Sequence, residues 1–403
     1  MDPTAALCEL YDSLLDSSPY IPDYRAGVYQ QGQALALTAK FTSQPTTTPA
    51  PPTYVDIDQY QKLQQLKDTF SSPAINPNSF RNARADANPY EKIGTSIFAN
   101  RAGVKLANID AVHQLSGTVF TPSHLTDSRE FTFCDAAGGP GSFTQYLQYR
   151  YPNSHGYGIT LAQVPGLDWN NRVVDETRFD RYYGPSNSGD LYLEAPNYIN
   201  YVLSKLPDGV DLVVADGGFE VDDEAASSGA ADPSKFQQQE FLSSRLLLSE
   251  AMVAVACCKA GGNAVIKVFD TVTKWSAELI LLLAQCFERI LLFKPISSRP
   301  ASGEQYLLCM SRRMAVKNYY DILASNYRQY TAETYSSSVI QQYIPDGFRD
   351  WLTSSNESSV ARQWTACERI IRLLAQQPVD IPEVNTSTAL LVWNLPDNPI
   401  ASS

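Results

Sequence analysis

Short β-rich runs alternate with longer helical runs from residue 76 to about residue 314. Alternation of this kind is typical of a mostly parallel sheet that is covered by helices on both faces. The sequence therefore predicts an α/β fold. We expect strands at 131–135, 156–161, 211–216, 262–269, 289–293 and 305–310, and helices at 103–115, 141–150, 191–203, 234–258 and 275–286.

The two ends of the chain lack this alternation. Residues 42–53 are rich in Pro and Thr without a hydrophobic period, which predicts an exposed linker or a loosely held strap after a short, separate N-terminal piece. Residues 316 to about 376 are expected to be helical and to cap the fold. The tail after Pro378 has too many Pro and Asn residues to assign. We expect an N-terminal extension (1–75), a central domain (76–315) and a mainly helical C-terminal extension (316–403).

Composition and charge narrow the function. The 403 residues are 44% apolar, which predicts a packed core, and 31 basic against 43 acidic residues give a formal charge of −12. An even field of that sign repels a polyanion, which excludes a nucleic-acid binder that is basic all over. The charge is uneven, however, because residues 190–232 hold ten acids and one base, whereas 81–105 and 294–317 are net positive. If the fold joins these two stretches, they form a local basic face.

Several classes of protein are disfavoured by the cysteines, the histidines and the length of the apolar runs. Seven cysteines without a CxxC pair argue against a disulfide framework or zinc knuckle, and three unpaired histidines do not support a catalytic metal. The longest apolar stretches, near 246–258 and 279–287, fall short of the roughly 18–20 residues of a membrane span. The first residues do not form a secretory signal. We expect a chain inside a cell, with reduced thiols and no membrane partner.

A glycine-rich turn joins the first strand to the first helix of the alternating region. The strand at 131–135 leads directly into AAGGPGSF, residues 136–143. Such a turn brings the backbone close to a ligand at a helix N-terminus. Pro140 interrupts the GxGxxG spacing and the GK[ST] ending is missing, which disfavours NAD and ATP. An Asp at the strand end with a Gly-Pro-Gly turn suits S-adenosylmethionine instead. The alternative is a tight turn without a ligand.

Several motifs carry a resemblance to a known family. DAAGGPGSF, VVADGGF (213–219), AVIKVFD (264–270) and FKPISSRPASGEQY (293–306) follow the order seen in RrmJ/FtsJ-like 2′-O-methyltransferases. ANRAGVKLANID (99–110), GYGITL (156–161) and the KPISSRP run are similar to segments of eukaryotic cap 1 mRNA methyltransferases. The resemblance covers about residues 76–312. It implies a Rossmann-like, S-adenosylmethionine-dependent methyltransferase fold with N- and C-terminal extensions.

The family's catalytic tetrad falls on Lys105, Asp216, Lys267 and Glu304. An alcohol must lose its proton as it attacks the methyl carbon, so a neutral acceptor near pH 7 is needed. Lys267 lies in an apolar strand, where burial and a second cation can lower a lysine pKa from about 10.4 toward about 7 to 8, while a nearby carboxylate raises it. We assign Lys267 as general base or hydroxyl-orienting residue. The two acids would orient and balance the lysines, and Lys105 would position ribose or phosphate. The alternative for Lys267 is a strand-end lysine that reaches solvent.

The resemblance also implies a cofactor pocket. Asp135 would face the methionine amino group or lie just behind it, and Asp216 would border both cofactor and substrate. Asp190 matches a residue that accepts from the adenine amino group, although a helix N-cap is the alternative. The expected cofactor-binding residues are Asp135, Ala137, Gly139, Pro140, Gly141, Phe143, Asp190 and Asp216.

For RNA, we expect Arg101, Lys105, Lys294, Ser298 and Arg299 to contact the substrate, chiefly its phosphates, which fix register without reading sequence. The 23 tyrosines can supply a stacking platform for a base. No single aromatic residue is assigned to it, because a core role is favoured for Tyr90, Phe98, Phe219 and Tyr306. The acids at 222–224 either accept hydrogen bonds from a cap guanine or form a solvated loop.

Three functions remain open. The first is 2′-O-methylation of the first transcribed nucleotide of capped mRNA, with other capping or transcription proteins as further partners. The second is methylation of rRNA or tRNA, and the third is an RNA-binding or scaffold subunit without catalysis. The complete tetrad argues against the third, and the cap-like segments favour the first. The expected location is the nucleus for a cellular enzyme and the cytoplasm for a viral one.

Overall fold

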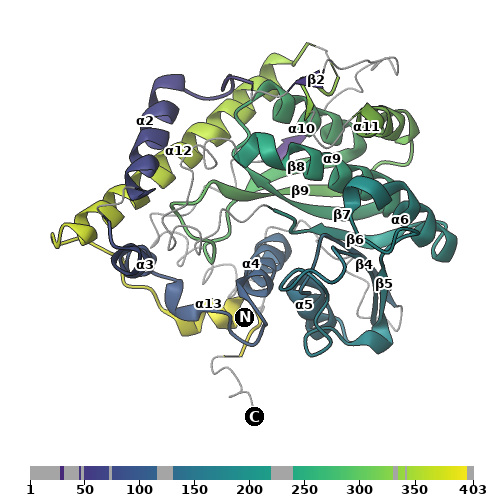
Figure 1. The fold of residues 1–403 in the computed structure, drawn as a ribbon, viewed down its shortest axis with the longest axis horizontal. Helices are drawn as coiled ribbons and strands as arrows, with labels where there is room; N and C mark the ends of the chain where they lie inside the picture. The colour runs from purple at the N-terminus through teal and green to yellow at the C-terminus, as the bar shows by residue number, and fades with distance from the viewer. Residues whose placement is uncertain are drawn as a thin grey trace.

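A computed structural model shows the fold (Figure 1). It describes residues 28–30, 45–46, 50–71, 75–115, 130–218, 239–329, 335–340 and 343–396. Most of the N-terminal piece, the start of the helix expected at 234–258, Phe219 and the acids at 222–224 lie outside the described residues. None of the described helices is long and apolar enough to cross a membrane.

Eight strands of the described residues form one mixed sheet in the order β1-β8-β9-β7-β6-β3-β4-β5. The five strands from β7 to β5 run parallel, whereas β9 is antiparallel to both of its neighbours. Every residue of β6 is buried, as expected for a parallel strand that is covered on both faces. The strands are β1 Val28–Gln30, β3 Phe131–Ala136, β4 Ser154–Ile159, β5 Phe179–Tyr182, β6 Val210–Ala215, β7 Cys258–Phe269, β8 Phe287–Phe293 and β9 Glu304–Arg312.

Helices cover both faces of this sheet (Figure 1). On one face lie α6 Leu191–Lys205, α9 Gln239–Cys257, α10 Lys274–Cys286 and α11 Lys317–Gln329, and on the other lie α4 Arg101–Leu115 and α5 Ser142–Arg150. Each face has its own hydrophobic core. The predicted mostly parallel sheet with helices on both faces is therefore confirmed. All six predicted strands exist, and only β1, β5 and the two-residue strands described below were not expected.

Both chain ends add elements to this central layer. They are α2 Ile57–Asp68, α3 Pro77–Asp86, α12 Asp346–Leu374, α13 Thr386–Val392 and the short helices η1 Thr69–Ser71 and η2 Glu91–Ile93. A further short helix, η3 Glu176–Arg178, lies between β4 and β5. A small second sheet pairs β2 Pro45–Thr46 with β10 Tyr335–Ser336, so the expected C-terminal helical run is interrupted. The N-terminal piece is not wholly separate, because β1 pairs with β8. In the tail that was left unassigned, Trp393 follows α13 and is buried in the core.

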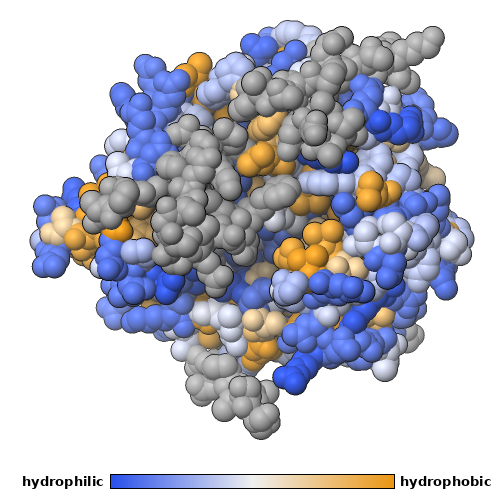
Figure 2. Space-filling view, in the orientation of Figure 1, coloured by the Kyte–Doolittle hydropathy of each residue, from blue (hydrophilic) through white to orange (hydrophobic). Residues whose placement is uncertain are grey.

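On the face shown in Figure 2, polar residues predominate at the periphery. Figure 2 shows hydrophilic residues over the helices at the periphery of this view, with hydrophobic residues gathered in a few smaller patches. The apolar side chains are largely used to pack the two faces of the sheet, as the hydrophobic effect requires.

One buried amide ties the C-terminal extension to the sheet. Asn356 of α12 is 2% exposed, and its Nδ2 donates to the backbone oxygens of Tyr54 at 2.8 Å and Thr271 at 2.9 Å. The Thr271 hydroxyl donates to the Asn356 side-chain oxygen at 2.7 Å. Thr271 follows β7 directly after Asp270, so α12 holds the chain where that strand ends.

Asn356→Leu should therefore destabilise the protein by about 3 kcal/mol, because it leaves buried carbonyl and hydroxyl groups without partners. The free energy of unfolding from urea titration measures this. Glu357→Gln, on the adjacent exposed position, is the matched control and should stay within about 0.5 kcal/mol of the parent. A loss for Asn356→Leu no larger than that of the control would contradict the bracing role.

Candidate active site

The glycine-rich turn packs tightly against its surroundings. It occupies Ala137–Gly141, between the end of β3 and the start of α5. A side chain at Gly138 would place its Cβ 2.1 Å from the carboxylate of Asp135, and one at Gly139 would lie 1.7 Å from the backbone oxygen of Leu167. Both distances are shorter than any real contact, so only glycine fits these two positions.

Asp135 is a fully buried carboxylic acid at the start of this turn. Its Oδ2 accepts from the Thr144 hydroxyl at 2.7 Å, whereas its Oδ1 has no hydrogen-bond partner among the described residues. Burial raises the pKa of Asp135 to about 7, although the Thr144 hydrogen bond opposes the shift. A buried acceptor oxygen without a partner suits a ligand that brings a cationic donor.

The glycine turn and Gly189, which precedes Asp190, both lie against Thr160. The backbone N–H of Gly139 donates to the Thr160 hydroxyl at 3.2 Å, and a Cβ on Gly189 would lie 1.7 Å from the backbone oxygen of Thr160. Asp190 itself is the N-cap of α6, where its Oδ1 accepts from the backbone N–H of Tyr192 at 2.8 Å. The N-cap role considered for Asp190 is thus confirmed.

Phe143, one of the residues expected at the cofactor, lies in the hydrophobic core. It is 1% exposed, and its ring centroid is 6.1 Å from that of Tyr306 in the core beneath α5. The phenylalanine supports the turn from the protein side. Its position on the first turn of a helix with a buried inner face explains the difference.

The structure brings the four tetrad residues together in two ion pairs. Lys105 Nζ from α4 lies 2.8 Å from Oε1 and 2.9 Å from Oε2 of Glu304, at the start of β9. Lys267 Nζ from β7 lies 3.3 Å from Oδ1 of Asp216, and it donates to the backbone oxygen of the same residue at 2.7 Å. All four side chains are largely buried.

Sheet register explains how these residues meet. β6 and β7 are parallel, so Asp216 follows the end of one strand beside the end of the other, which carries Lys267. β9 runs antiparallel to β7 and places Tyr306 opposite Lys267 and Glu304 opposite Phe269. The carboxyl ends of two parallel strands and the amino end of an antiparallel one therefore form a single site.

The expectation of a neutral Lys267 is wrong for this structure. Burial lowers the pKa of the amine, but Asp216, Glu304 and Glu250 outweigh it, so the pKa lies above its usual value. Glu304 shows the reverse balance, because burial is outweighed by nearby lysines that hold its pKa far below the usual range. Lys267 and Glu304 are therefore charged at neutral pH.

The fold brings residues of the two basic stretches together, which is the condition set for a basic face, but acids share the surface with them. Arg101 donates to the backbone oxygen of Ser297 at 2.9 Å and lies 2.7 Å from Glu91. Arg299 lies 3.7 Å from the same carboxylate. Ser298, expected at the RNA, donates instead to Oε1 of Glu304 at 2.7 Å. Glu91 and Glu304 therefore offset much of the local positive charge.

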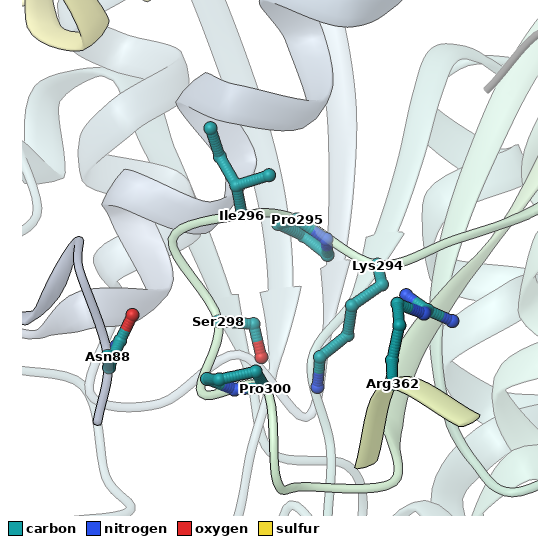
Figure 3. Close-up of a pocket in the computed structure, with 7 residues that line it drawn as sticks. All are labelled: Asn88, Lys294, Pro295, Ile296, Ser298, Pro300 and Arg362. Atoms are coloured by element: carbon teal, nitrogen blue, oxygen red, sulfur yellow. The ribbon is translucent and has the colours of Figure 1, made fainter. Parts of the chain in front are cut away.

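Lys294 differs from the expected phosphate contact. It is 4% exposed, and its Nζ donates to the backbone oxygens of Ser302 at 2.9 Å and Glu304 at 2.6 Å. Its side chain lines a small cavity together with Asn88, Pro295, Ile296, Ser298, Pro300 and Arg362 (Figure 3). The amine therefore donates to backbone oxygens of the protein itself. The sequence alone did not indicate this role.

Three further residues join the site that sequence reasoning did not assign. Tyr306, buried, donates to Oδ1 of Asp216 at 2.8 Å, and Thr144 bonds Asp135. Glu250 is 1% exposed, and a Cβ on Gly217 would lie 2.2 Å from its Oε1. Two signals were available: Tyr306 lies two positions after Glu304 on one strand face, and Glu250 is the lone acid in an apolar helical run.

Comparison with known proteins adds the family. Residues 98–312, more than half of the chain, match the FtsJ-like methyltransferase family. The chain belongs to this family. FtsJ-like methyltransferases use S-adenosylmethionine as methyl donor. The methionine amino group of this donor is a cation that needs a buried acceptor, and the unpartnered Oδ1 of Asp135 beside the glycine turn fits it.

Several curated relatives of this FtsJ-like chain share one name. It is 32% identical to the cap-specific mRNA (nucleoside-2′-O-)-methyltransferase 1 of Ailuropoda melanoleuca over 357 residues, which cover 83% of this chain and 41% of the relative. The protein of the same name from Homo sapiens is 31% identical over the same coverage. That from Drosophila melanogaster is 29% identical over 80% of this chain and 42% of its own length. The chain spans about two fifths of the length of the curated relatives it matches.

Proposed function

We propose that this protein transfers a methyl group from S-adenosylmethionine to the ribose 2′-hydroxyl of the first transcribed nucleotide of capped mRNA. The observation that carries the proposal is the pair of lysine–carboxylate contacts at the ends of β6, β7 and β9. Supporting observations are the glycine turn with Asp135 and the cap-specific activity in the names of the relatives. These relatives come from animals, which favours a nuclear cellular enzyme over a viral one.

Asp135 and the turn hold the cofactor in this proposal. The Asp135 carboxylate accepts from the amino group, and the backbone of Ala137–Gly141 lines the pocket. Asp190 lies at the neighbouring helix start for the adenine, and Asp216 borders cofactor and substrate. When bound, S-adenosylmethionine supplies an activated methyl carbon on a positively charged sulfur. Phe143 supports the turn from below.

Lys267 acts on the substrate hydroxyl. Asp216, Glu304 and Glu250 favour the charged state of Lys267. In this state its ammonium donates a hydrogen bond to the substrate hydroxyl and orients the oxygen. The positive charge of bound S-adenosylmethionine would lower the pKa of the Lys267 amine. Lys267 could then accept the proton of the hydroxyl. The proton would thus move from the 2′-oxygen to Nζ as the oxygen–carbon bond forms and the carbon–sulfur bond of the donor breaks, with its electron pair left on the sulfur. Asp216, held by Tyr306, fixes the position of the amine.

Lys105 and the loop before Glu304 position the RNA. Arg101 and Arg299 share Glu91, which keeps the two guanidinium groups near each other for phosphate contacts. Lys105 is held by Glu304 and contributes the ribose or phosphate contact, and Ser298 acts through the same carboxylate. Because acids offset these cations, binding to generic RNA should be weak and salt-sensitive.

Transfer of labelled methyl to short RNAs with and without a 7-methylguanosine cap tests the function. The parent protein should label capped RNA at the first 2′-oxygen. Lys267→Met should lower the single-turnover rate by at least about 100-fold, because proton transfer and orientation are both lost. Lys317→Met, which removes a lysine that is 82% exposed, is the matched control and should keep the parent rate.

Other outcomes separate the alternatives. Equal labelling of uncapped RNA would remove the cap assignment and favour an rRNA or tRNA substrate. Labelling of no RNA would favour a scaffold. A near-normal rate for a folded Lys267→Met variant would remove Lys267 from the mechanism.

The affinity for S-adenosylmethionine should depend on pH through Asp135. The folded pKa of about 7 lies above the usual 3.8, so the carboxylate that accepts from the amino group is present only above about pH 7. The dissociation constant, measured calorimetrically, should rise by up to about tenfold per pH unit below pH 7 and level off above it. Asp135→Asn should weaken binding at pH 8 and remove this dependence.

Asp175→Asn is the control for this titration. The Asp175 carboxylate caps η3 at the surface, and hydrogen bonds from Thr177 and Arg178 hold its pKa at about 2, so it stays ionised throughout the range. Its variant should keep the parent pH dependence. A constant affinity of the parent protein from pH 5.5 to 8 would exclude the Asp135 contact.

A further inference from the structure

The segment between β8 and β9 carries several residues of the proposed site. It begins at Lys294, contains Ser298 and Arg299, and ends at Glu304. Two of its polar side chains are Ser298, which donates to the Glu304 carboxylate, and Arg299, which lies near Glu91. The position of this loop decides where the Glu304 carboxylate meets Lys105. We call residues 294–304 the tetrad loop.

Lys294 holds both ends of the tetrad loop from inside. It is the first residue of the loop, and its amine reaches the backbone oxygens of Ser302 and Glu304, at the other end. A single side chain thus closes the loop on itself. The oxygens at 2.9 and 2.6 Å are at hydrogen-bond distance, and a buried carbonyl without a donor is costly.

The surroundings of Lys294 favour this internal role over contact with RNA. The residue is 4% exposed, so its ammonium cannot reach a phosphate without opening the loop. The charged groups around it are Glu304 of β9, Arg362 of α12, Lys105 of α4 and Lys67 of α2. Burial is the main cause that lowers the pKa of Lys294 to about 7; Glu304 opposes it, and the three cations add to it. A neutral amine has two N–H donors, which matches the two carbonyl oxygens.

Asn88 and Arg362 enclose the loop from opposite sides (Figure 3). Together with loop residues they line the cavity described above. Neither of them is an acid, and among the described residues no acid lines this cavity, so no described carboxylate holds Lys294 by an ion pair across it. The backbone oxygens of the loop itself are its acceptors.

We propose that Lys294 is a positioning residue that clamps the tetrad loop and so places Glu304 against Lys105. It contacts neither RNA nor cofactor. The proposal goes beyond the proposed methyl transfer, and its kinetic part rests on that function. A misplacement of a catalytic group by about 1 Å can cost about 100-fold in rate, so the clamp should act on turnover and leave RNA affinity alone.

A labelling experiment on the unaltered protein tests the placement without any activity. The chain is treated with an amine-reactive ester, with and without a 7-methylguanosine-capped oligoribonucleotide, and modified lysines are quantified by mass spectrometry. Lys294 should react at least about tenfold more slowly than the exposed Lys317 in both states, because its amine is buried. Fast reaction in the free protein with protection by RNA would overturn the clamp, whatever the protein methylates.

Two variants test the role in turnover. Lys294→Met removes the donors, and Lys294→Arg keeps the charge but places a larger group in the buried site. Both should lower the rate of methyl transfer about 10- to 100-fold, with the affinity for capped RNA and its salt dependence as in the parent. Arg299→Gln is the contrasting variant and should weaken RNA binding and reduce the salt slope by about 1.

The kinetic pattern decides between clamp and phosphate contact. If Lys294→Met reduces the salt slope like Arg299→Gln while Lys294→Arg binds RNA like the parent, Lys294 is a phosphate ligand and the clamp is overturned. Parent-like turnover of a folded Lys294→Met variant overturns it as well. If thermal unfolding shows that the variants do not fold, the labelling pattern of the unaltered chain decides the placement. Absence of methyl transfer in the parent protein instead concerns the proposed function.

Discussion

Two lysines and two carboxylates share one largely buried site. The free-energy cost of burying these charges is the constraint on which the rest of the structure around the site depends. An ion taken out of water must be paired, and removal of one partner leaves an expensive unpaired charge. Lys105 with Glu304 and Lys267 with Asp216 satisfy this requirement. The sheet register, the Tyr306 hydroxyl and the tetrad loop all serve to hold these partners at contact distance.

Parts of the chain outside the matched family region support this site. Asp270, which follows β7, donates from its backbone N–H to the backbone oxygen of Gly303, directly before Glu304. The carboxylate of Asp270 accepts from the Tyr60 hydroxyl of α2 at 3.3 Å and from the Gln363 amide of α12 at 3.4 Å. The two extensions therefore converge on Asp270, which follows the strand of Lys267 and contacts the residue before Glu304. The helices α2 and α12, one from each extension, also pack side by side (Figure 1).

The sequence predicted the central layer because its strands and helices are encoded locally, whereas the four tetrad residues were named from the resemblance to the family. Apolar strands with Asp135, Asp216 and Lys267 at or near their ends are visible in short windows, and parallel packing then brings strand ends together. Residues that depend on three-dimensional partners were harder to place. The charge state of Lys267 reflects three carboxylates from separate segments, and the burial of Lys294 reflects a loop that folds over it. α13 and Trp393 were missed because their order comes from tertiary packing, not from a local pattern.

The central claim is that the Lys105–Glu304 pair is stable only as a pair, and a double-mutant cycle on the free energy of unfolding tests it most directly. Lys105→Met and Glu304→Gln should each destabilise the protein, by about 3 kcal/mol, because each leaves one buried charge without its partner. The double variant should be more stable than either single variant, since no charge then remains uncompensated. Losses that simply add in the double variant would contradict this account of the site.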